Sequence, residues 1–468
     1  MSKTEDLVLR CLLPGFAGAS APDWVLGRVA SGLGGVVLYG RNVEDRAQLT
    51  ALNAALHAER PELLVAIDEE GGDVTRLEAR TGSSYPGNLA LGAAGDPSLT
   101  SAVADAIGSE LAEVGIDLDL APVVDVNTNP QNPVIGVRSF GSDAAAVAAH
   151  SVAWITGLQG SGVAACAKHF PGHGDTSVDS HLGLPVVEED PHVRALAPFR
   201  AAIGCGVQAI MSAHIAAPTI DDRPATISRR VMTGLLREEL GFSGLAVSDA
   251  LEMRGLSDGR DVADVAVGAL VAGCDALCIG GHLAGEEVVD EIVRAVVAAL
   301  EQGRLSEDRL AEAASRVDAL AAWRKGRGKP AQVSNQVGMV AARRAVRSEG
   351  PVRVGREAVV IQLETTRSVA AGDVPWGVAA SLAARGVTVT ATQDLDTAAG
   401  KSVVLVVKDL HRLPEQRQVI DSLLARRPDA ILVEMGVPVC RPAAARAYIA
   451  THGSARVCAE AAAEVMAR

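Results

Sequence analysis

One short stretch of the sequence concentrates side chains that can transfer protons or bind ligands. Residues 167–181 read Ala-Lys-His-Phe-Pro-Gly-His-Gly-Asp-Thr-Ser-Val-Asp-Ser-His and follow an apolar run at 162–167. The proline and glycines of the stretch prevent it from continuing as a strand or a helix. Loops carried by a rigid scaffold are where binding and catalysis concentrate. We therefore predict an active-site loop here, with a solvated surface turn as the alternative.

Asp179 and His181 have the spacing of an acid–base pair. In an extended segment, side chains at i and i+2 point to the same face. The Asp179 carboxylate can then accept a hydrogen bond from one imidazole nitrogen of His181, and the other nitrogen can deliver a proton. Asp249, which ends the apolar run 244–248, is the natural nucleophile. A carboxylate nucleophile and a separate proton donor are the parts of a retaining glycosidase.

The same loop also allows a metal site. Imidazoles and carboxylates are ligands that zinc or iron would use. The loop offers His169, His173, Asp175, Asp179 and His181. No His-x-Glu or His-x-x-x-His pair lies on an evident helix, and Lys168 would place a cation beside the metal. We therefore expect a reaction without metal or cofactor, and a metal-dependent barrel hydrolase stays the alternative.

Composition bounds the class of protein. The chain has 468 residues, a net charge of −14 and only 3% aromatic residues. Its length suggests two or three domains, and its acidic balance argues against a nucleic-acid partner. The scarcity of aromatic side chains weighs against a long polysaccharide groove and favours a compact pocket lined by polar groups.

The sequence also predicts a cytoplasmic location. The acidic start and the break at Pro14-Gly15 do not fit a signal peptide. No window approaches 18 uncharged apolar residues, so we expect no membrane span. The seven cysteines lie mostly inside apolar runs, as buried free thiols do in a reducing compartment.

Short apolar runs alternate with helix-like segments over the first part of the chain. This alternation predicts an α/β fold, a TIM-like (β/α)8 barrel over residues 1–325. The expected strands are Leu7–Phe16, Gly35–Leu38, Leu63–Ile67, Ile116–Val124, Val163–Ala167, Val207–Met211, Leu245–Val247 and Asp275–Ile279. Helical segments at 283–300 and 308–324 are expected to close the barrel.

Five of the expected strands run directly into charged or imidazole side chains. Chemistry in such a barrel gathers at the carboxyl ends of the strands. The strand-end groups are Asp68 with Arg76, Asp125, Lys168 with His169, His214 and Asp249. We expect them to meet at one mouth of the barrel, where His214 lines the pocket floor or makes an internal hydrogen bond.

The remainder of the chain predicts a second, smaller domain. Residues 326–355 are rich in Lys, Arg, Gly and Pro and indicate a linker with one helical piece near 337–346. Residues 356–468 predict an α/β sandwich. Its expected strands are Ala358–Leu363, Ser402–Val407 and Ala430–Val433, and its helices lie around Trp376–Arg385, Leu413–Arg426 and Arg441–Ile449.

Four motifs together resemble a known family. They are residues 168–181, Asp-Glu-Glu-Gly-Gly at 68–72, Asn-Pro-Val-Ile-Gly-Val-Arg-Ser-Phe-Gly at 132–141 and Ser-Asp-Ala-Leu-Glu-Met at 248–253. The chain resembles glycoside hydrolase family 3, most closely its β-N-acetylglucosaminidase branch of peptidoglycan-recycling enzymes. The resemblance covers about residues 5–320, and the last domain is similar, more weakly, to the α/β sandwich that some members carry.

The resemblance implies a role for each matching residue. It implies that Asp249 is the nucleophile and that His181, oriented by Asp179, is the general acid/base. The residues that would hold the non-reducing GlcNAc are Asp68, Arg76, Arg138, Lys168 and His169. For each of these the alternative is a structural salt bridge at the barrel mouth. The implied substrates are small amino-sugar glycosides, either muropeptides or chitooligosaccharides, cleaved by an exo-acting, cofactor-free enzyme.

The chain also departs from the family pattern. The usual motif has Gln and Arg where this sequence has Glu69 and Asp73, so we expect the pocket rim to differ. A β-N-acetylglucosaminide phosphorylase is an alternative, because a histidine repels incoming phosphate less than a second carboxylate would. The Asp-Ser-His motif argues against a β-glucosidase, and intact Asp249 and His181 argue against a catalytically inactive sugar-binding protein.

Overall fold

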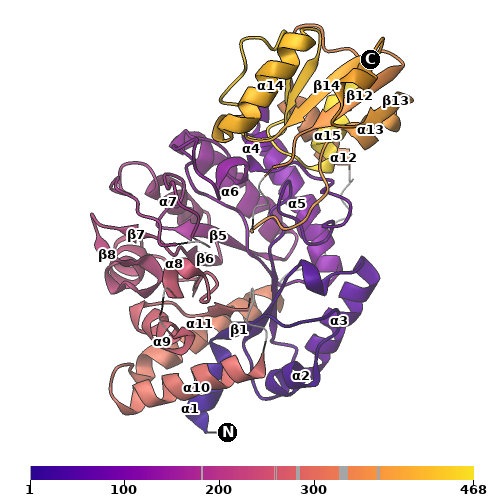
Figure 1. Cartoon of the computed structure of the whole chain (residues 1–468). Helices are drawn as coiled ribbons and strands as arrows, with labels where there is room; N and C mark the ends of the chain where they lie inside the picture. The colour runs from indigo at the N-terminus through magenta and orange to yellow at the C-terminus, as the bar shows by residue number, and fades with distance from the viewer. Residues whose placement is uncertain are drawn as a thin grey trace.

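The computed structural model describes residues 2–180, 183–257, 259, 261–280, 285–325, 336–365 and 369–467. The chain forms two parts that follow each other in the sequence (Figure 1). The larger part runs from indigo to salmon in the figure, and the smaller part, in orange and yellow, lies at its upper end.

Parallel strands form the centre of the larger part. They are β1 (Leu12–Pro14), β2 (Gly35–Leu38), β3 (Leu64–Ile67), β4 (Leu118–Asp119), β5 (Ala164–Phe170), β6 (Ala209–Ser212), β9 (Leu245–Val247) and β10 (Leu277–Ile279). β2 to β6 and β9 form one curled sheet, in chain order, and β1 pairs with β10. A parallel bridge between Val247 and Ala276 links the two sheets. Each run expected as a strand overlaps one of these strands, but Leu7–Arg10 of the first run belongs to a helix, because the segment is capped as a helix by Ser2. The predicted TIM-like fold is confirmed.

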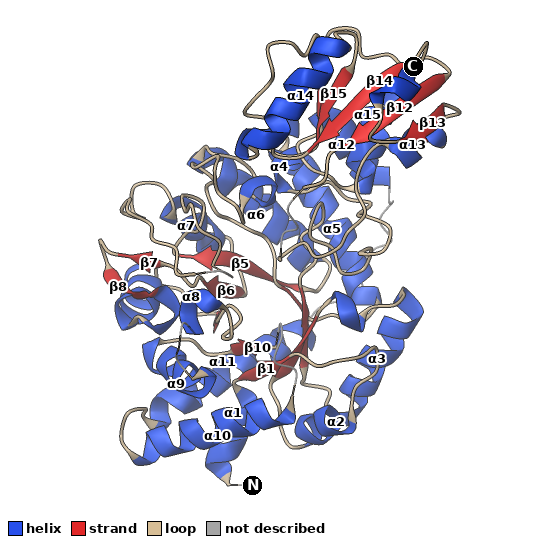
Figure 2. Ribbon diagram, viewed as in Figure 1, coloured by secondary structure: helices blue, strands red, loops and turns tan. Residues whose placement is uncertain are grey.

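Helices cover the outside of the curled sheet (Figure 2). Several begin at a capping aspartate: Asp45 accepts from the N–H of Gln48 at the start of α3, and Asp143 accepts from Ala146 at the start of α6. The helices are α1 (Lys3–Arg10), α2 (Asp23–Ala30), α3 (Arg46–Glu59), α4 (Asn88–Ala94), α5 (Pro97–Glu113), α6 (Ala144–Gly160), α7 (Leu196–Gly204), the π-helical η4 (Arg230–Glu239), α8 (Arg254–Ser257), α9 (Val262–Ala272), α10 (Glu286–Glu301) and α11 (Glu307–Lys325). A short hairpin, β7 (Ala216–Ala217) and β8 (Asp221–Pro224), projects beyond β6.

Small and large apolar side chains together fill the interior of the barrel. Ala66, Cys166 and Ala209 pack in one apolar cluster with larger residues such as Leu118 and Leu245. The same cluster includes Val317 and Leu320 of α11, so this helix packs against the strand residues inside the barrel. The segments expected to close the barrel are therefore present as α10 and α11.

The smaller part is a three-layered α/β domain. Its sheet has the order β11-β16-β15-β14-β12-β13, with β11 antiparallel to β16. The strands are β11 (Arg347–Glu349), β12 (Glu357–Gln362), β13 (Thr388–Ala391), β14 (Ser402–Val407), β15 (Ile431–Glu434) and β16 (Ala447–Ala450). Helices α13 (Ala379–Ala383) and α15 (Arg456–Ala467) pack on one face, and α14 (Pro414–Arg426) packs on the other.

The helix expected over Arg441–Ile449 is wrong. Residues Ala447–Ala450 form β16, which is buried in the sheet with helices on both faces. A strand covered on both faces is apolar throughout, so its short alanine-containing sequence does not alternate and resembles a buried helix. Helix α15 was not expected from the sequence. In the segment expected as a linker, the helical piece predicted near 337–346 is present as α12 (Gln336–Ala345), whereas β11 was not predicted. The predicted domain boundaries stay predictions.

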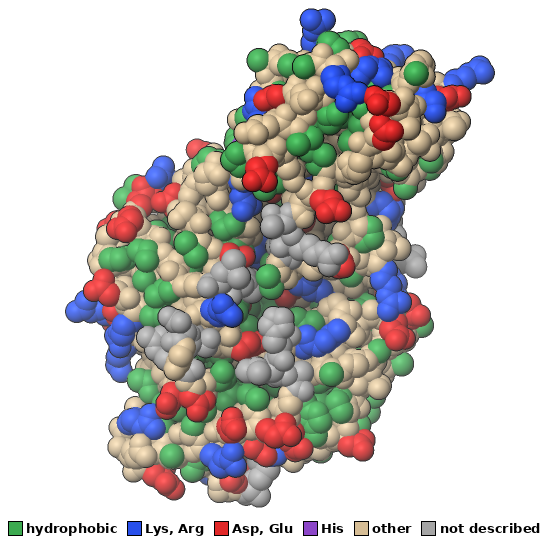
Figure 3. Space-filling view, in the orientation of Figure 1, with side chains coloured by type: hydrophobic (Ala, Val, Ile, Leu, Met, Phe, Trp, Pro, Cys, Tyr) green, Lys and Arg blue, Asp and Glu red, His purple; other side chains and the backbone are tan. Residues whose placement is uncertain are grey.

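The two parts are in direct contact (Figure 3). An apolar cluster joins α4 of the barrel to α12 and α15. Its buried members are Ala90, Ala342, Ala345, Ala455, Val457, Cys458 and Ala461. Ion pairs border it, for example Arg344 with Asp96 at 2.7 Å. The second domain is thus fixed to the barrel by side-chain packing as well as by the chain.

The helices and the cysteines bear on two expectations from the sequence, the absence of a membrane span and the presence of free thiols. Among the described residues, no helix is both long enough and apolar enough to cross a membrane. All seven cysteines lie in described positions, and none forms a disulfide bond.

The buried carboxylate of Asp275, which precedes β10, provides a test of how the barrel is held together. Asp275 is fully buried and contacts Arg237 of η4, and Arg309 and Arg316 of α11, the latter two at 2.8 and 3.0 Å. Removing the anion takes the buried partner from all three guanidinium groups, of which only Arg309 and Arg316 keep the more exposed Glu312 among the described residues. We expect Asp275→Ala to lower the free energy of unfolding by about 3–5 kcal/mol, measured by urea denaturation.

Asp318→Ala is the matched control. Asp318 pairs with Arg10 at 2.5 Å, but its side chain is 53% exposed. Solvent-exposed pairs contribute roughly 0–1 kcal/mol, so this variant should unfold almost like the parent protein. Equal losses in the two variants would contradict the structural role assigned to Asp275.

Candidate active site

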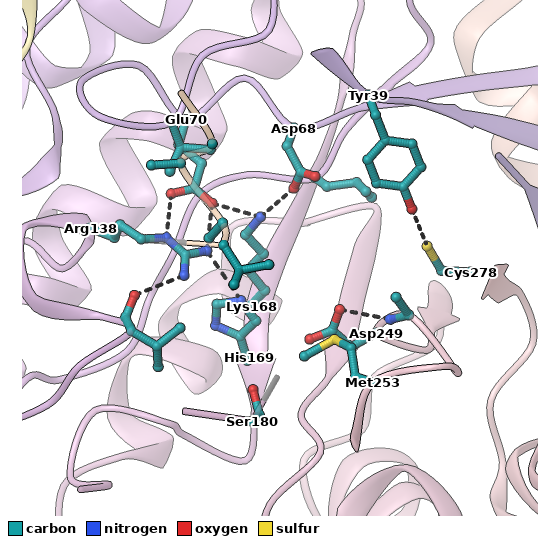
Figure 4. A pocket seen from close by; sticks show the side chains of 18 of the residues that line it. Tyr39, Asp68, Glu70, Arg138, Lys168, His169, Ser180, Asp249, Met253 and Cys278 are labelled. Atoms are coloured by element: carbon teal, nitrogen blue, oxygen red, sulfur yellow. Dashed lines mark hydrogen bonds and ion pairs between the residues drawn. The ribbon is translucent and has the colours of Figure 1, made fainter. Parts of the chain in front are cut away.

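A cavity of about 760 Å³ opens at the carboxyl ends of the barrel strands. Residues at the ends of seven strands contribute to its lining, so the chain brings together groups that are up to about 240 positions apart. These strand-end residues are Tyr39, Asp68, Leu120, Lys168, Met211, Asp249 and Cys278. Figure 4 shows the labelled side chains converging on the cavity from opposite sides. This is the position at which enzymes with this fold place their chemistry.

A network of buried charges forms one wall of the cavity. The ammonium group of Lys168 lies 2.7 Å from Asp68 and 2.8 Å from Glu70. Glu70 also accepts two hydrogen bonds from the guanidinium of Arg138, at 2.9 and 2.7 Å. The side chains of Lys168 and Glu70 are each 3% exposed, so the pairing compensates the cost of burying them.

The network sets the protonation of its members. Burial by itself would raise the pKa of Glu70, but the neighbouring Arg138 and Lys168 outweigh burial and hold that pKa well below its usual range. Burial would lower the pKa of Lys168, and the carboxylates of Asp68 and Glu70 raise it instead. The carboxylate of Glu70 and the ammonium of Lys168 are therefore both charged at neutral pH.

Arg76 connects this wall to the second domain. Its guanidinium lies 3.7 Å from the Asp68 carboxylate and donates a hydrogen bond to the carbonyl oxygen of Ala370 at 2.8 Å. Ala370 belongs to the segment 369–373, all of which lines the cavity. In Figure 1 an orange segment of the second domain runs down to the barrel mouth. The cavity is therefore built from both domains.

His169 is oriented by a buried carboxylate. Its Nδ1 lies 2.7 Å from Oδ2 of Asp125. Asp125 is fully buried and follows β4 by six residues. The Nε2 of His169 lies 3.5 Å from the Arg138 guanidinium, on the cavity side. An Nδ1–H that donates to Asp125 leaves Nε2 as the acceptor for the Arg138 guanidinium, so both nitrogens help to fix the ring.

Asp249 follows β9 and faces the charged wall across the cavity (Figure 4). The backbone N–H of Ala250 donates to Oδ1 of Asp249 at 2.7 Å. The turn is held from beneath by His214, whose Nε2 donates to the Ala250 carbonyl oxygen at 2.8 Å while its Nδ1 lies 2.8 Å from the Thr226 hydroxyl. His214 is fully buried. Of the two roles expected for it, the structure shows the internal hydrogen bond.

The loop after β5 brings its residues to the same cavity. His173 and Ser180 line it, and their side chains lie 3.1 Å apart. Burial and the neighbouring His169 lower the pKa of His173 to about 4, so this imidazole is neutral at physiological pH. Asp179 is half-buried and precedes Ser180. His181 lies outside the described residues.

Comparison with known proteins gives the family. The description "Glycosyl hydrolase family 3 N terminal domain" matches residues 28–320. This chain belongs to glycosyl hydrolase family 3. The resemblance seen in the sequence motifs is confirmed, and so is the enzyme class of glycoside hydrolase.

Individual relatives show how far the likeness extends. Beta-hexosaminidase A of Pseudoalteromonas piscicida is 37% identical over 314 residues, 61% of this chain and 52% of the relative, so the match spans about half of that protein. The solved family 3 β-N-acetylglucosaminidase from Paenibacillus sp. str. FPU-7 has a TM-score of 0.91 and 33% identity, with 100% of this chain and 96% of that one covered. The β-N-acetylhexosaminidase from Beutenbergia cavernae DSM 12333 has a TM-score of 0.63 and 32% identity, with 69% of this chain and 99% of that one covered.

The site of this family 3 chain contains most of the residues singled out in the sequence. Lining a single cavity are Asp68, Arg76, Arg138, Lys168, His169 and Asp249. Asp179 is described but is not among the lining residues. Sequence reasoning missed Glu70, although it lies two positions after Asp68 in the same strand-end motif. It also missed segment 369–373, for which the sequence carries no signal.

The two departures from the family 3 pattern have different surroundings. Asp73 does not line the cavity; its carboxylate contacts Lys408 and Ser454 of the second domain. Glu69 is buried, and its Oε2 accepts the backbone N–H groups of Arg76 and Leu77 at 2.7 and 2.9 Å. Neither side chain lines the cavity, and the expected difference at the pocket rim stays a prediction.

The described residues contain no group of three or more His, Cys, Asp and Glu side chains arranged to hold a metal ion. His181, the last imidazole of the loop, is outside the residues to which this observation applies.

The stability of this family 3 chain should depend on pH through Glu69. Burial raises the pKa of Glu69 to about 7, against hydrogen bonds from the Leu77 N–H and its neighbours that lower it. The unfolded chain releases this proton near the ordinary value of 4.5. Stability from this group is therefore present below about pH 4.5 and is lost as pH rises through about 7. Glu69→Gln should raise Tm at pH 8, by roughly 2 °C or more, and leave it unchanged at pH 5.

Glu434 in the second domain is the matched comparison. Burial raises its pKa to about 7 as well, but both of its carboxylate oxygens accept backbone N–H groups, from Asp409, Leu410 and Gly436. A glutamine at 434 would point an amide N–H₂ at one of these donors. Glu434→Gln should therefore give no gain at pH 8, and a pH-independent effect of Glu69→Gln in differential scanning would refute the account of Glu69.

Proposed function

We propose that this family 3 chain is a retaining exo-β-N-acetylglucosaminidase. It removes a terminal, non-reducing GlcNAc from muropeptides or small chitooligosaccharides. The names of its relatives, β-hexosaminidase and β-N-acetylglucosaminidase, support the sugar. The sequence motifs and the arrangement of the cavity support the rest of the proposal. This comprises the muropeptide substrate, the retention of the anomeric configuration and the role of each residue.

One observation carries the proposal. The carboxylate of Asp249 shares a cavity with a wall of hydrogen-bonding charges whose donors and acceptors suit the hydroxyls of a sugar. Asp68 supplies acceptor oxygens, and Lys168 and Arg138 supply donors, at fixed positions set by the mutual pairing. A hexopyranose presents adjacent hydroxyls that both donate and accept, so it can join such a wall without displacing the charges.

The first half of the reaction forms a covalent intermediate. With the sugar held on the charged wall, an oxygen of Asp249 attacks the anomeric carbon. The bond from that carbon to the leaving oxygen breaks, and His181 in its protonated form donates a proton to that oxygen. Asp179 stabilises the imidazolium and holds its tautomer. The leaving sugar departs neutral, and GlcNAc stays attached to Asp249 as an ester.

The second half returns the enzyme to its starting state. His181, now neutral, accepts a proton from a water molecule while the water oxygen bonds to the anomeric carbon. The ester bond to Asp249 breaks, and its electron pair returns to the carboxylate. Two inversions give net retention of the β configuration.

The proposed activity is tested by the products. The full chain is incubated with GlcNAc-MurNAc and with chitobiose, with and without phosphate. Release of β-GlcNAc at equal rates in both buffers is the expected result. Accumulation of GlcNAc-1-phosphate would assign the chain as a phosphorylase, and no cleavage of either disaccharide or of an aryl β-GlcNAc would overturn the proposal. Incubation with EDTA is expected to leave the rate unchanged.

The nucleophile can be identified by chemical rescue. Asp249→Ala should reduce turnover of an aryl β-GlcNAc by roughly 10⁴-fold or more, because the variant lacks the carboxylate that forms the ester. Added azide is small enough to attack from the position of the missing carboxylate. The expected product is the α-glycosyl azide, detected by NMR.

Glu252→Ala is the matched control for this rescue. Glu252 also lines the cavity, three positions after Asp249, and its carboxylate accepts the backbone N–H of Gly280 at 3.1 and 3.2 Å. Azide should not accelerate the Glu252 variant. Formation of the α-azide by that variant, and not by Asp249→Ala, would assign the nucleophile to Glu252.

The acid can be identified by its dependence on the leaving group. His181→Ala should slow cleavage of chitobiose by about 10²- to 10⁴-fold, because the sugar alkoxide needs a proton to leave. The glycosylation step with a dinitrophenyl glycoside should be slowed much less, because that leaving group departs as an anion. Pre-steady-state kinetics on the two substrates give the comparison.

His173→Ala separates acid catalysis from loss of loop structure. His173 is buried in the same loop, where its ring is hydrogen-bonded to the hydroxyl groups of Thr176 and Ser180. Its lowered pKa keeps it neutral at physiological pH. Its replacement should slow both substrates to a similar extent. The same pattern in His181→Ala would exclude His181 as the proton donor.

A further inference from the structure

A buried ion pair joins the two domains next to the cavity. Lys408, directly after β14, places its ammonium group 2.5 Å from the Asp73 carboxylate. Ser454 completes the contact: its backbone N–H and its hydroxyl each donate to Asp73 at 2.8 Å. The Asp73 side chain is 7% exposed and that of Lys408 is 17% exposed. A carboxylate with this many fixed donors holds the chain around it in one position.

The barrel side of this ion pair is the loop that carries the sugar-binding wall. Asp73 lies between Glu70 and Arg76, and its neighbour Val74 lines the cavity. The loop is tight, because an antiparallel bridge joins Gly71 to Val74 and Gly72 has a φ of +66°. A displacement of Asp73 would therefore also displace its neighbours in the loop, among them Val74, which lines the cavity.

The second-domain side of the ion pair holds the segment that enters the cavity. The ammonium of Lys408 also lies 5.9 Å from the centre of the Trp376 ring, within the range of a cation–π contact. Trp376 follows segment 369–373 by three residues. Between them, the Pro375 carbonyl oxygen packs against Gly82 of the barrel, where a Cβ would lie 3.2 Å away. The segment is thus fixed at the end nearest Lys408.

The two sides meet at Arg76. The Ala370 carbonyl oxygen accepts a hydrogen bond from Arg76 at 2.8 Å, and the same guanidinium faces Asp68 at 3.7 Å. We propose that Lys408 is a positioning residue for sugar binding, because it holds both the loop that carries Arg76 and the segment that orients its guanidinium. The second domain is then part of the sugar-binding site. This inference rests on the proposed function, because the ligand is the amino sugar.

The matched variant is Lys408→Met, which keeps a long unbranched side chain and removes the charge. Coupling through such a network changes binding by about 3- to 30-fold. We expect the inhibition constant of free GlcNAc and the KM for an aryl β-GlcNAc to rise by that factor, with kcat nearly unchanged. Such a pattern marks loss of binding rather than of the chemical step. Lys408→Arg, which restores the cation, should recover most of the affinity.

Arg344→Gln controls for general weakening of the domain contact. Arg344 pairs with Asp96 between the same two domains at 2.7 Å, with side chains 50% and 27% exposed, away from the cavity lining. This variant should bind GlcNAc like the parent protein. If Lys408→Met lowers Tm but leaves GlcNAc inhibition unchanged, the ion pair only joins the domains and the inference is overturned.

Trp376→Leu provides an independent test of the positioning role if the Lys408 variant does not fold. It removes the ring beneath the ammonium group and leaves the Asp73–Lys408 pair in place. A rise in the GlcNAc inhibition constant supports the inference, and an unchanged constant in the folded variant refutes it. A parent protein that neither cleaves the aryl glycoside nor binds GlcNAc by calorimetry would instead refute the proposed function.

Discussion

The ammonium group of Lys168 is the charge around which the barrel mouth is organised. It is almost completely buried, and only the two carboxylates of Asp68 and Glu70 make that burial tolerable. Glu70 in turn fixes Arg138, and Asp68 faces Arg76. Each group is held by its neighbour, so the wall is preorganised before a ligand arrives. A site of this kind binds hydroxyl groups without the cost of reorienting its own donors and acceptors.

The opposite wall is built in a different way. Asp249 sits on a turn that is held by backbone hydrogen bonds and by the buried His214, rather than by ion pairs. His214 contacts the turn through the Ala250 carbonyl oxygen and is itself anchored on Thr226. Its imidazole therefore serves the site without entering it. The cavity therefore has a wall of paired charges on one side and the Asp249 carboxylate on the other.

The second domain gives this chain a third source of active-site structure. The barrel supplies the strands, and yet Arg76 is oriented by a carbonyl oxygen that lies nearly 300 residues later in the chain. The contacts of Asp73 show how the second domain is held against the barrel next to Arg76. Where the family pattern has a cation, this chain has an anion, and that anion accepts hydrogen bonds from Ser454 and pairs with Lys408. The change is part of the contact that docks the second domain.

The sequence by itself determined the barrel and most of the charged wall. Apolar runs that alternate with helices specify parallel strands, and the side chains that follow them must meet at one end, so Asp68, Lys168, His169 and Asp249 could be placed together. The roles of Asp179 and His181 stay predictions. Only the tertiary structure decided the partner of Asp73, the contribution of segment 369–373 and the strand at Ala447–Ala450. These depend on which distant surfaces pack together, and local periodicity carries no information about contacts between residues so far apart in the chain.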